Sequence, residues 1–157
     1  MATSNPKKGA PKSKPQPDQK RGEKLARLAQ RWGGHTIILN DGFTPVPRSF
    51  LKYAAQLKPY SLTPAESLFV LNLMFFKWDA RSPFPSYATL ASRMGVSVQY
   101  TRDIARKLER KGLMLRTVRR GQPNEFDLQP LFDALAKHVE AEIAAGRDKT
   151  KRKLIVL

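Results

Sequence analysis

The chain contains no cysteine, only two histidines and few acidic residues. Its 157 residues include 13 Asp and Glu against 29 Lys and Arg. Without cysteine, the protein can form neither a disulfide nor a thiolate metal site. His35 and His138 are far apart in the sequence, so neither is expected to bind a metal, and the scarcity of carboxylates argues against a two-metal nuclease.

Motifs of common enzyme classes and of membrane proteins are also missing. The sequence has no phosphate-binding glycine loop, no Gly-x-Ser-x-Gly elbow and no HExxH motif. No apolar run approaches the ~20 residues that cross a bilayer, and the N-terminus does not resemble a signal peptide. We therefore expect a binding protein, not an enzyme, that needs no cofactor or metal, binds no membrane and lies in the cytoplasm with the nucleoid.

Positive charge, in contrast, is abundant and lies in three stretches. The formal net charge is +16. Residues 1–24 carry 7 basic and 2 acidic side chains, residues 97–121 carry 8 and 2, and residues 147–153 carry 5 and 1. The rest of the chain is close to neutral and can pack. This distribution indicates a polyanionic partner, and nucleic acid is the commonest one.

The first 60 residues are expected to hold a tail and a small extension. Residues 1–22 have four prolines and almost no apolar side chains, which predicts a disordered basic tail. The pattern of residues 23–60 predicts a helix, a strand and a second helix, over residues 23–32, 36–39 and 49–57. Their expected apolar or capping residues are Leu25, Leu28 and Trp32 in the first helix, and Ser49, Phe50, Leu51, Ala54 and Leu57 in the second.

Residues 61–129 have the pattern of a winged helix-turn-helix domain, mainly α-helical with a small β-hairpin. Its first helix begins with a capping box, formed by Thr63 and Glu66, and Pro64 occupies the first helical position. The apolar residues of this helix recur at steps of three and four, at Leu68, Leu71, Phe75 and Trp78. The helix is expected to be mostly buried, with an apolar surface widened by Phe69, Val70, Leu73, Met74 and Phe76.

Two further helices are separated by a short turn that contains Gly95. Ser86 is expected to cap a helix that ends near Met94, and Ser97 a second helix that ends before Gly112. Two helices joined in this way form a helix-turn-helix unit. Ala91 is small where the helices approach each other, and a larger side chain there would push them apart.

The second helix is expected to be the recognition helix. Burial of its apolar side turns Gln99, Arg102 and Arg106 outward, and these side chains suit adenine and guanine in the major groove. Ser97 and Tyr100, near the helix N-terminus, suit phosphates. A merely solvated basic face is the alternative, and Asp103 is expected either to orient an arginine or to reject bases. The predicted DNA-binding residues are Ser97, Gln99, Tyr100, Arg102, Arg106, Lys107, Arg119 and Arg120.

A hairpin and a last helix complete the pattern. Residues 113–118 and 125–128 are expected to pair as a wing, with Arg119 and Arg120 projecting at its tip towards a minor groove or phosphates. A C-terminal helix over residues 130–146 has an apolar stripe that either joins two protomers or folds back on Phe69 and Phe75. Residues 147–157 form a basic tail with an unexplained apolar end.

The domain resembles a family of bacterial winged-helix proteins. The motifs that carry the resemblance are FPS at 84–86, TLA at 89–91, MGVS at 94–97 and LERKGL at 108–113. Similar motifs occur in plasmid and phage replication initiators, DnaD-like primosome proteins and short helix-turn-helix regulators, and the resemblance covers about residues 62–135. It implies a DNA-binding winged helix. We expect no second domain after residue 157, which favours a small regulator or accessory protein.

Three functions remain open from the sequence. The first is a sequence-specific transcriptional regulator, acting on double-stranded DNA as a homodimer. The second is an accessory protein of plasmid- or phage-type replication initiation or of the primosome. The third is an architectural or adaptor protein that binds DNA with little sequence preference and recruits a protein partner.

Overall fold

The computed structural model describes residues 17–147, and the chain divides into two compact units, Met1–Phe43 and Thr44–Leu157. Most of the predicted N-terminal tail and all but the first residue of the C-terminal tail lie outside the described residues. None of the helices within residues 17–147 is long and apolar enough to cross a membrane. Each unit is described by itself.

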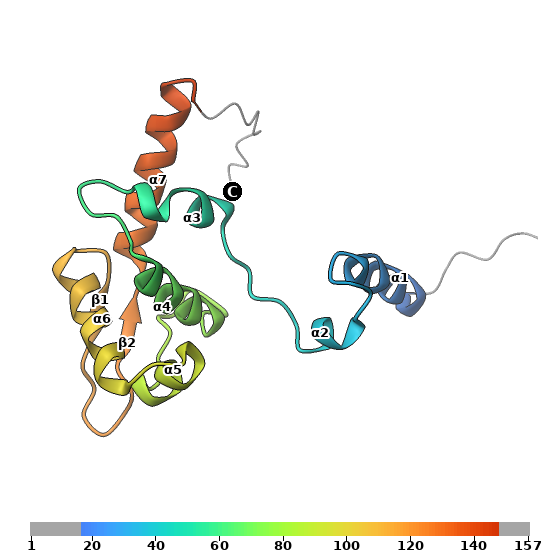
Figure 1. The fold of residues 1–157 in the computed structure, drawn as a ribbon, viewed down its shortest axis with the longest axis horizontal. Coiled ribbons are helices and arrows are strands. Elements are labelled where there is room, and N and C mark those ends of the chain that lie inside the picture. The colour runs from blue at the N-terminus through green and yellow to red at the C-terminus, as the bar shows by residue number, and fades with distance from the viewer. Residues whose placement is uncertain (1–16, 148–157) are drawn as a thin grey trace, which may run out of the picture. The chain divides into compact units, whose positions relative to one another are not determined.

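The first unit contains two helices, α1 (Pro17–Gln30) and α2 (Thr36–Asn40), joined by a turn at Gly33 and Gly34 (Figure 1). Two expectations were wrong here. Helix α1 begins at residue 17, within the predicted disordered tail, and it ends before Trp32, whose side chain is exposed. Trp32 follows the last helical turn, so it does not share a face with the helix residues before it.

The strand expected over residues 36–39 is the helix α2. Its β-branched residues favour a strand, but a strand needs a partner for its backbone N–H and C=O groups, and the described part of this unit contains none. A helical turn satisfies these groups locally instead. Leu39 is buried, whereas Ile37 and Ile38 remain exposed.

The second unit is a winged helix with an added helix at each end (Figure 1). A single hydrophobic core joins Phe50, Phe69, Leu108, Phe126 and Leu131. Residues from 44 onward thus belong to this unit, whereas the sequence placed the boundary at residue 60. The elements are α3 (Arg48–Tyr53), a 3₁₀ turn (Ala54–Gln56), α4 (Pro64–Phe75), α5 (Tyr87–Met94), α6 (Val98–Arg110), β1 (Leu115–Thr117), β2 (Glu125–Asp127) and α7 (Gln129–Ala144).

Helix α3 is shorter than expected, and its buried residues differ from the expected set at Leu51 and Tyr53. It follows Pro47 rather than a Ser49 cap, and it ends at Tyr53, where a 3₁₀ turn begins. The tighter 3₁₀ geometry changes the angular step between side chains. Phe50, Ala54 and Leu57 are buried as expected. Tyr53 is buried as well, with its ring 4.9 Å from that of His138 on α7, whereas Leu51 faces solvent.

Helix α4 confirms the predicted capping box and part of the predicted apolar surface. The Thr63 N–H donates to Glu66 Oε2 at 2.7 Å, and the Glu66 N–H donates to Thr63 Oγ1 at 3.3 Å. The buried face is formed by Phe69, Val70, Leu73 and Met74. Leu68 is exposed, and Trp78 lies beyond the helix end, so the expected stripe through both was wrong.

The helix-turn-helix has the predicted caps and turn. Ser86 and Ser97 accept hydrogen bonds from the backbone N–H of Thr89 and Tyr100, at 3.0 and 3.1 Å. Gly95 ends α5 in the left-handed region, at φ 66°. These features fix the angle between α5 and α6, and therefore the direction in which α6 is presented.

Ala91 lies in the packed surface of α5 and is only 3% exposed. Replacing Ala91 with leucine is expected to lower the free energy of unfolding by about 1–3 kcal/mol, because the extra carbons must push neighbouring side chains or backbone apart. Chemical denaturation measures this loss. The exposed neighbour Ser92 offers a control, and Ser92→Leu is expected to change stability much less. Equal effects would show that α5 does not pack through Ala91.

Strands β1 and β2 form the antiparallel wing, with Arg116 opposite Phe126. Helix α7 follows directly, with Pro130 in its first turn as predicted. Leu131 and Leu135 are buried in the same core as Phe69. The apolar stripe of α7 therefore folds back on its own domain for most of its length, and only the outer end near Ile143 is exposed.

Candidate nucleic-acid interface

The N-terminal end of α6 is stabilised by Ser97. Besides capping the helix, Ser97 accepts a hydrogen bond through its carbonyl oxygen from the hydroxyl of Thr101, which is buried, at 2.9 Å. Ser97 itself is exposed, and so is Tyr100. Both predicted phosphate-binding residues therefore lie at the solvent-exposed start of the helix, where the helix dipole favours anions.

Three side chains on the outer face of α6 form one hydrogen-bonded group. Gln99 Nε2 donates to Asp103 Oδ1 at 3.2 Å, and Arg106 Nη1 forms an ion pair with the same oxygen at 3.2 Å. Of the two roles expected for Asp103, the geometry favours orientation. Asp103 holds the amide of Gln99 and the guanidinium of Arg106 side by side, both exposed.

Arg102 lies on the same face and leans towards α5. Its Cζ is 5.7 Å from the centroid of the Tyr87 ring. It forms no ion pair among the residues that the structure describes, so its donors face solvent. Lys107 is also exposed. The predicted recognition residues of α6 thus remain available to a ligand, and their contact with DNA stays a prediction.

Tyr87 and Arg116 connect the recognition helix to the wing, and the sequence analysis missed both. Arg116 on β1 donates to the Tyr87 hydroxyl at 2.9 Å and to Glu109 Oε1 at 3.0 Å. Burial disfavours the charge of Arg116, but the bonds to Tyr87 and Glu109 outweigh burial and raise its pKa above the ordinary value. The Tyr87 ring also meets Phe126 of β2 edge-on, at 5.7 Å. The only signal in the sequence was the alternation of strand residues around Arg116.

A groove of about 350 Å³ separates the recognition helix from the tip of the wing. Its walls come from the start of α5, from Val98 and Arg102 on α6, and from Gln122 to Asn124 in the wing. Backbone N–H groups at a helix start and side-chain amides are common phosphate ligands. The groove is therefore of a kind that suits a phosphate backbone.

The wing tip differs from the prediction at Arg119. Arg119 does not project: its Nε donates to the Pro123 carbonyl at 2.9 Å, and its Nη1 pairs with Glu125 Oε1 at 2.8 Å. These bonds satisfy a guanidinium that closes the hairpin loop. Arg120 is exposed, as predicted, and is the freer cation at the tip.

The described residues offer no metal site. No three His, Asp or Glu side chains gather within residues 17–147 in a way that could hold a metal ion. Lys111, at the end of α6, instead pairs with Glu66 Oε2 at 2.6 Å and donates to the Ser61 carbonyl at 2.8 Å. This pair ties the recognition helix to the start of α4.

Comparison with known proteins supports the same assignment. Residues 60–114 match the family model of a helix-turn-helix domain. No curated protein matches the chain. The crystal structure of the N-terminal domain of DnaD protein from Geobacillus kaustophilus HTA426 is similar to it, with a TM-score of 0.55 and 25% sequence identity, over 78% of this chain and 96% of that chain. The chain therefore carries a helix-turn-helix domain, and its fold is similar to that of the DnaD N-terminal domain.

Proposed function

We propose that the protein binds double-stranded DNA, with α6 in the major groove and the wing beside it. The observation that carries the proposal is the exposed row of Gln99, Arg102 and Arg106 on a rigidly capped helix. An α-helix fits the major groove, and these residue types distinguish base pairs there. The tip of the wing lies across the protein's surface groove from this helix, at a position suited to the sugar-phosphate backbone.

Charge supports DNA as the ligand. The formal net charge is +16, and residues 97–121 carry 8 of the basic side chains. Such an excess attracts a polyanion and speeds association. In the proposed complex, Gln99, Arg102 and Arg106 act by hydrogen bonding to DNA, and the protein is a binding protein.

The proposed biological role is in DNA replication, as an initiation or primosome accessory protein. The structural similarity to the N-terminal domain of DnaD supports this role over the transcriptional regulator that the sequence analysis placed first. Regulation of transcription remains the second candidate, favoured by the row of base-reading side chains on α6. A binding site at a replication origin would support the first role, and one beside a promoter the second.

Selection of bound duplexes from a random pool, sequenced at two salt concentrations, tests the proposal. Enrichment of a motif is expected, because base contacts from α6 add discrimination to the salt-dependent phosphate contacts. Binding without enrichment, lost steeply as salt rises, would instead mean an architectural protein. An enriched inverted repeat would add that two protomers bind together.

A homodimer is proposed only through the outer end of α7. Leu131 and Leu135 serve the core of the domain, so Ile143 and its neighbours are what α7 can offer to a second copy. Analytical sedimentation compares the oligomeric state of the natural protein with that of Ile143→Glu, which is expected to be monomeric. A dimer that persists in this variant would place the contact elsewhere.

The two arginines at the wing tip, Arg119 and Arg120, are expected to respond differently to replacement by alanine. Arg120→Ala is expected to weaken binding of all duplexes alike and to make the salt slope shallower by about 0.9, the effect of losing one phosphate contact. Arg119→Ala is expected to act through the hairpin instead, so Glu125→Gln should reproduce its effect. Binding titrations at several salt concentrations measure both. If Arg119→Ala makes the salt slope shallower and Glu125→Gln does not, Arg119 contacts the DNA directly.

A further inference from the structure

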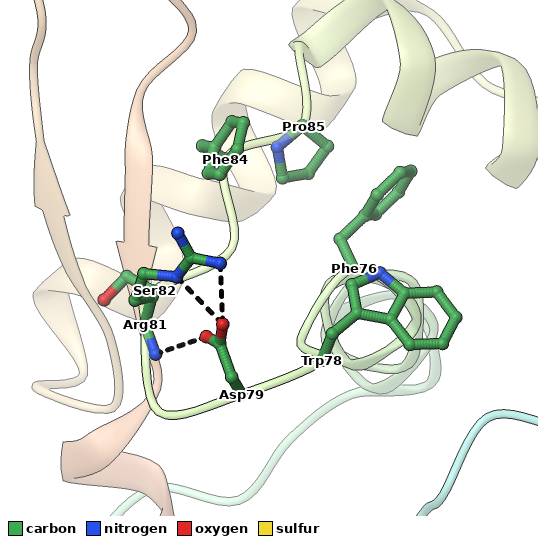
Figure 2. A pocket seen from close by; sticks show the side chains of 7 residues that line it. All are labelled: Phe76, Trp78, Asp79, Arg81, Ser82, Phe84 and Pro85. Atoms are coloured by element: carbon green, nitrogen blue, oxygen red, sulfur yellow. Dashed lines mark hydrogen bonds and ion pairs between the residues drawn. The ribbon is translucent and has the colours of Figure 1, made fainter.

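The loop between α4 and α5 forms a second pocket, away from the exposed face of α6. The pocket has a volume of about 280 Å³. Figure 2 shows Phe76 and Trp78 on one side of it, Phe84 and Pro85 on another, and Asp79 with Arg81 at its edge. The walls are thus mainly flat, apolar rings.

Two of these rings are unusually exposed. Trp78 is 76% exposed and Phe84 is 56% exposed. Neither belongs to the hydrophobic core, although both belong to the same compact unit. Large aromatic side chains that gather at a surface hollow commonly mark a binding site.

The loop that presents Trp78 is held by several internal hydrogen bonds. The Arg81 backbone N–H and its Nε donate to the Asp79 carboxylate at 2.8 and 2.9 Å. Lys77 Nζ donates to the carbonyl oxygens of Asp79, Ala80 and Arg81 at 3.1, 3.4 and 3.2 Å. These bonds order the loop around the indole, so a ligand would meet a preformed surface.

Arginines lie over two of the aromatic rings that line the pocket. Arg93 of α5 lies over the rings of Phe75 and Phe76, with Cζ at 3.8 and 4.9 Å from their centroids. Arg119 of the wing lies over the Phe84 ring at 5.2 Å. Aromatic faces flanked by cations suit a ligand that is both flat and negatively charged.

The loop that forms one wall of the pocket is hydrogen-bonded to the wing. The Phe126 N–H on β2 donates to the Pro83 carbonyl at 2.9 Å, which fixes the start of the Phe84–Pro85 wall against the hairpin. A nucleic-acid strand that leaves a duplex beside the wing would therefore pass near the loop that carries Phe84 and Pro85. The expected path of the strand rests on the proposed duplex binding, whereas the pocket itself does not.

We propose that the pocket binds unpaired bases of single-stranded DNA, which stack on Trp78 and Phe84. The rings supply stacking surface, and the exposed guanidinium of Arg93, over the Phe76 ring, supplies attraction to phosphates. A purely apolar protein segment would gain nothing from this charge. The protein would thereby recognise a junction where duplex and single strand meet.

Fluorescence anisotropy with three labelled probes tests this inference. The probes are a blunt duplex, the same duplex with a single-stranded overhang of about ten thymidines, and the same overhang made of abasic units. The thymidine overhang is expected to tighten binding about tenfold over the abasic one, since stacking of one base is worth about one factor of ten. Trp78→Ala should remove this gain and leave blunt-duplex binding unchanged.

Trp32→Ala is the matched control, because Trp32 is similarly exposed but belongs to the first unit. It should retain the full gain. Quenching of Trp78 fluorescence by thymidine oligomers, in a Trp32→Phe protein, provides a second measurement that needs no truncated aromatic residue. Phe84→Ala should reduce this quenching.

Three results would overturn the inference. Equal tightening by the thymidine and abasic overhangs would mean phosphate contacts alone. An unaltered gain in Trp78→Ala would place the strand elsewhere. Self-association that Trp78→Ala abolishes, with no effect on the overhang, would make the pocket a protein interface. Failure of blunt-duplex binding in every variant would count against the proposed function and not against the pocket.

Discussion

Replacing Lys111 with methionine is expected to lower the free energy of unfolding by about 3 kcal/mol. The ammonium group pairs with Glu66 Oε2 at 2.6 Å, and Glu66 is 2% exposed. Removing one partner of a buried ion pair leaves the other charged group without its counter-charge, which costs about 3–5 kcal/mol. The lower end applies here because the Lys111 side chain keeps partial contact with solvent.

Chemical denaturation near neutral pH measures this loss, with Lys107→Met as its control. Lys107 lies one turn earlier on α6 and is exposed, so its replacement should change stability by no more than about 0.5 kcal/mol. The double variant Glu66→Gln with Lys111→Met should be more stable than Lys111→Met alone, because it buries no unpaired charge. Equal losses for Lys107→Met and Lys111→Met would show that the pair contributes nothing.

The same pair predicts a dependence of stability on pH. Burial raises the pKa of Glu66, but the hydrogen bonds from Lys111 and Thr63 and the Lys111 charge outweigh burial and leave the pKa below its ordinary value of 4.5. The carboxylate therefore stabilises the fold fully above pH 4.5, and this stabilisation disappears as pH falls through the lower pKa of the folded state.

Glu66→Gln isolates this contribution from those of other carboxylates. The difference in unfolding free energy between the natural protein and this variant should be constant at neutral pH and should shrink as pH is lowered below 4.5. Denaturation curves collected at a series of pH values measure the difference. A difference that does not change with pH would contradict a depressed pKa for Glu66.

Local hydrogen-bonding signals made the helix-turn-helix predictable from sequence. Thr63, Ser86 and Ser97 cap their helices as expected. Each cap is predictable because the side-chain hydroxyl accepts a hydrogen bond from a backbone N–H only three residues further along the chain. Gly95 takes the positive φ that its place in the turn predicted. Each of these features depends on residues within one turn of the chain.

Features that depend on distant parts of the chain were less predictable. Residues 36–39 have strand propensity, yet they form a helix because the described part of their unit offers no strand to pair with. Leu51 was expected to be buried but faces solvent, because the packing of Tyr53 against His138 of α7, 85 residues further on, selects the buried face of α3. Propensity and periodicity do not contain this information.

The candidate site shows the same division. Gln99, Arg102 and Arg106 follow from helical periodicity and are exposed on one face. The inward turn of Arg119 depends on Glu125 across the hairpin, and the role of Arg116 depends on Tyr87, so neither could be predicted from neighbouring residues.

Arg102→Ala is expected to weaken binding to the selected DNA site about tenfold to a hundredfold and to relax preference at one base pair. A bidentate contact between arginine and guanine discriminates by about 1–3 kcal/mol, and about 1.4 kcal/mol corresponds to tenfold. Arg102 suits this role because it is exposed on α6 and forms no ion pair among the described residues. Affinities for the selected duplex and for its single-base variants measure the effect.

Arg102→Lys distinguishes base recognition from a phosphate contact. Lysine keeps the charge but lacks the planar pair of donors, so a base contact should be lost in both variants and a phosphate contact only in Arg102→Ala. Arg48→Ala, on α3, provides the control for loss of one exposed positive charge elsewhere. If Arg102→Lys binds every duplex as the natural protein does, Arg102 contacts phosphate, and base recognition rests with the group of Gln99, Asp103 and Arg106.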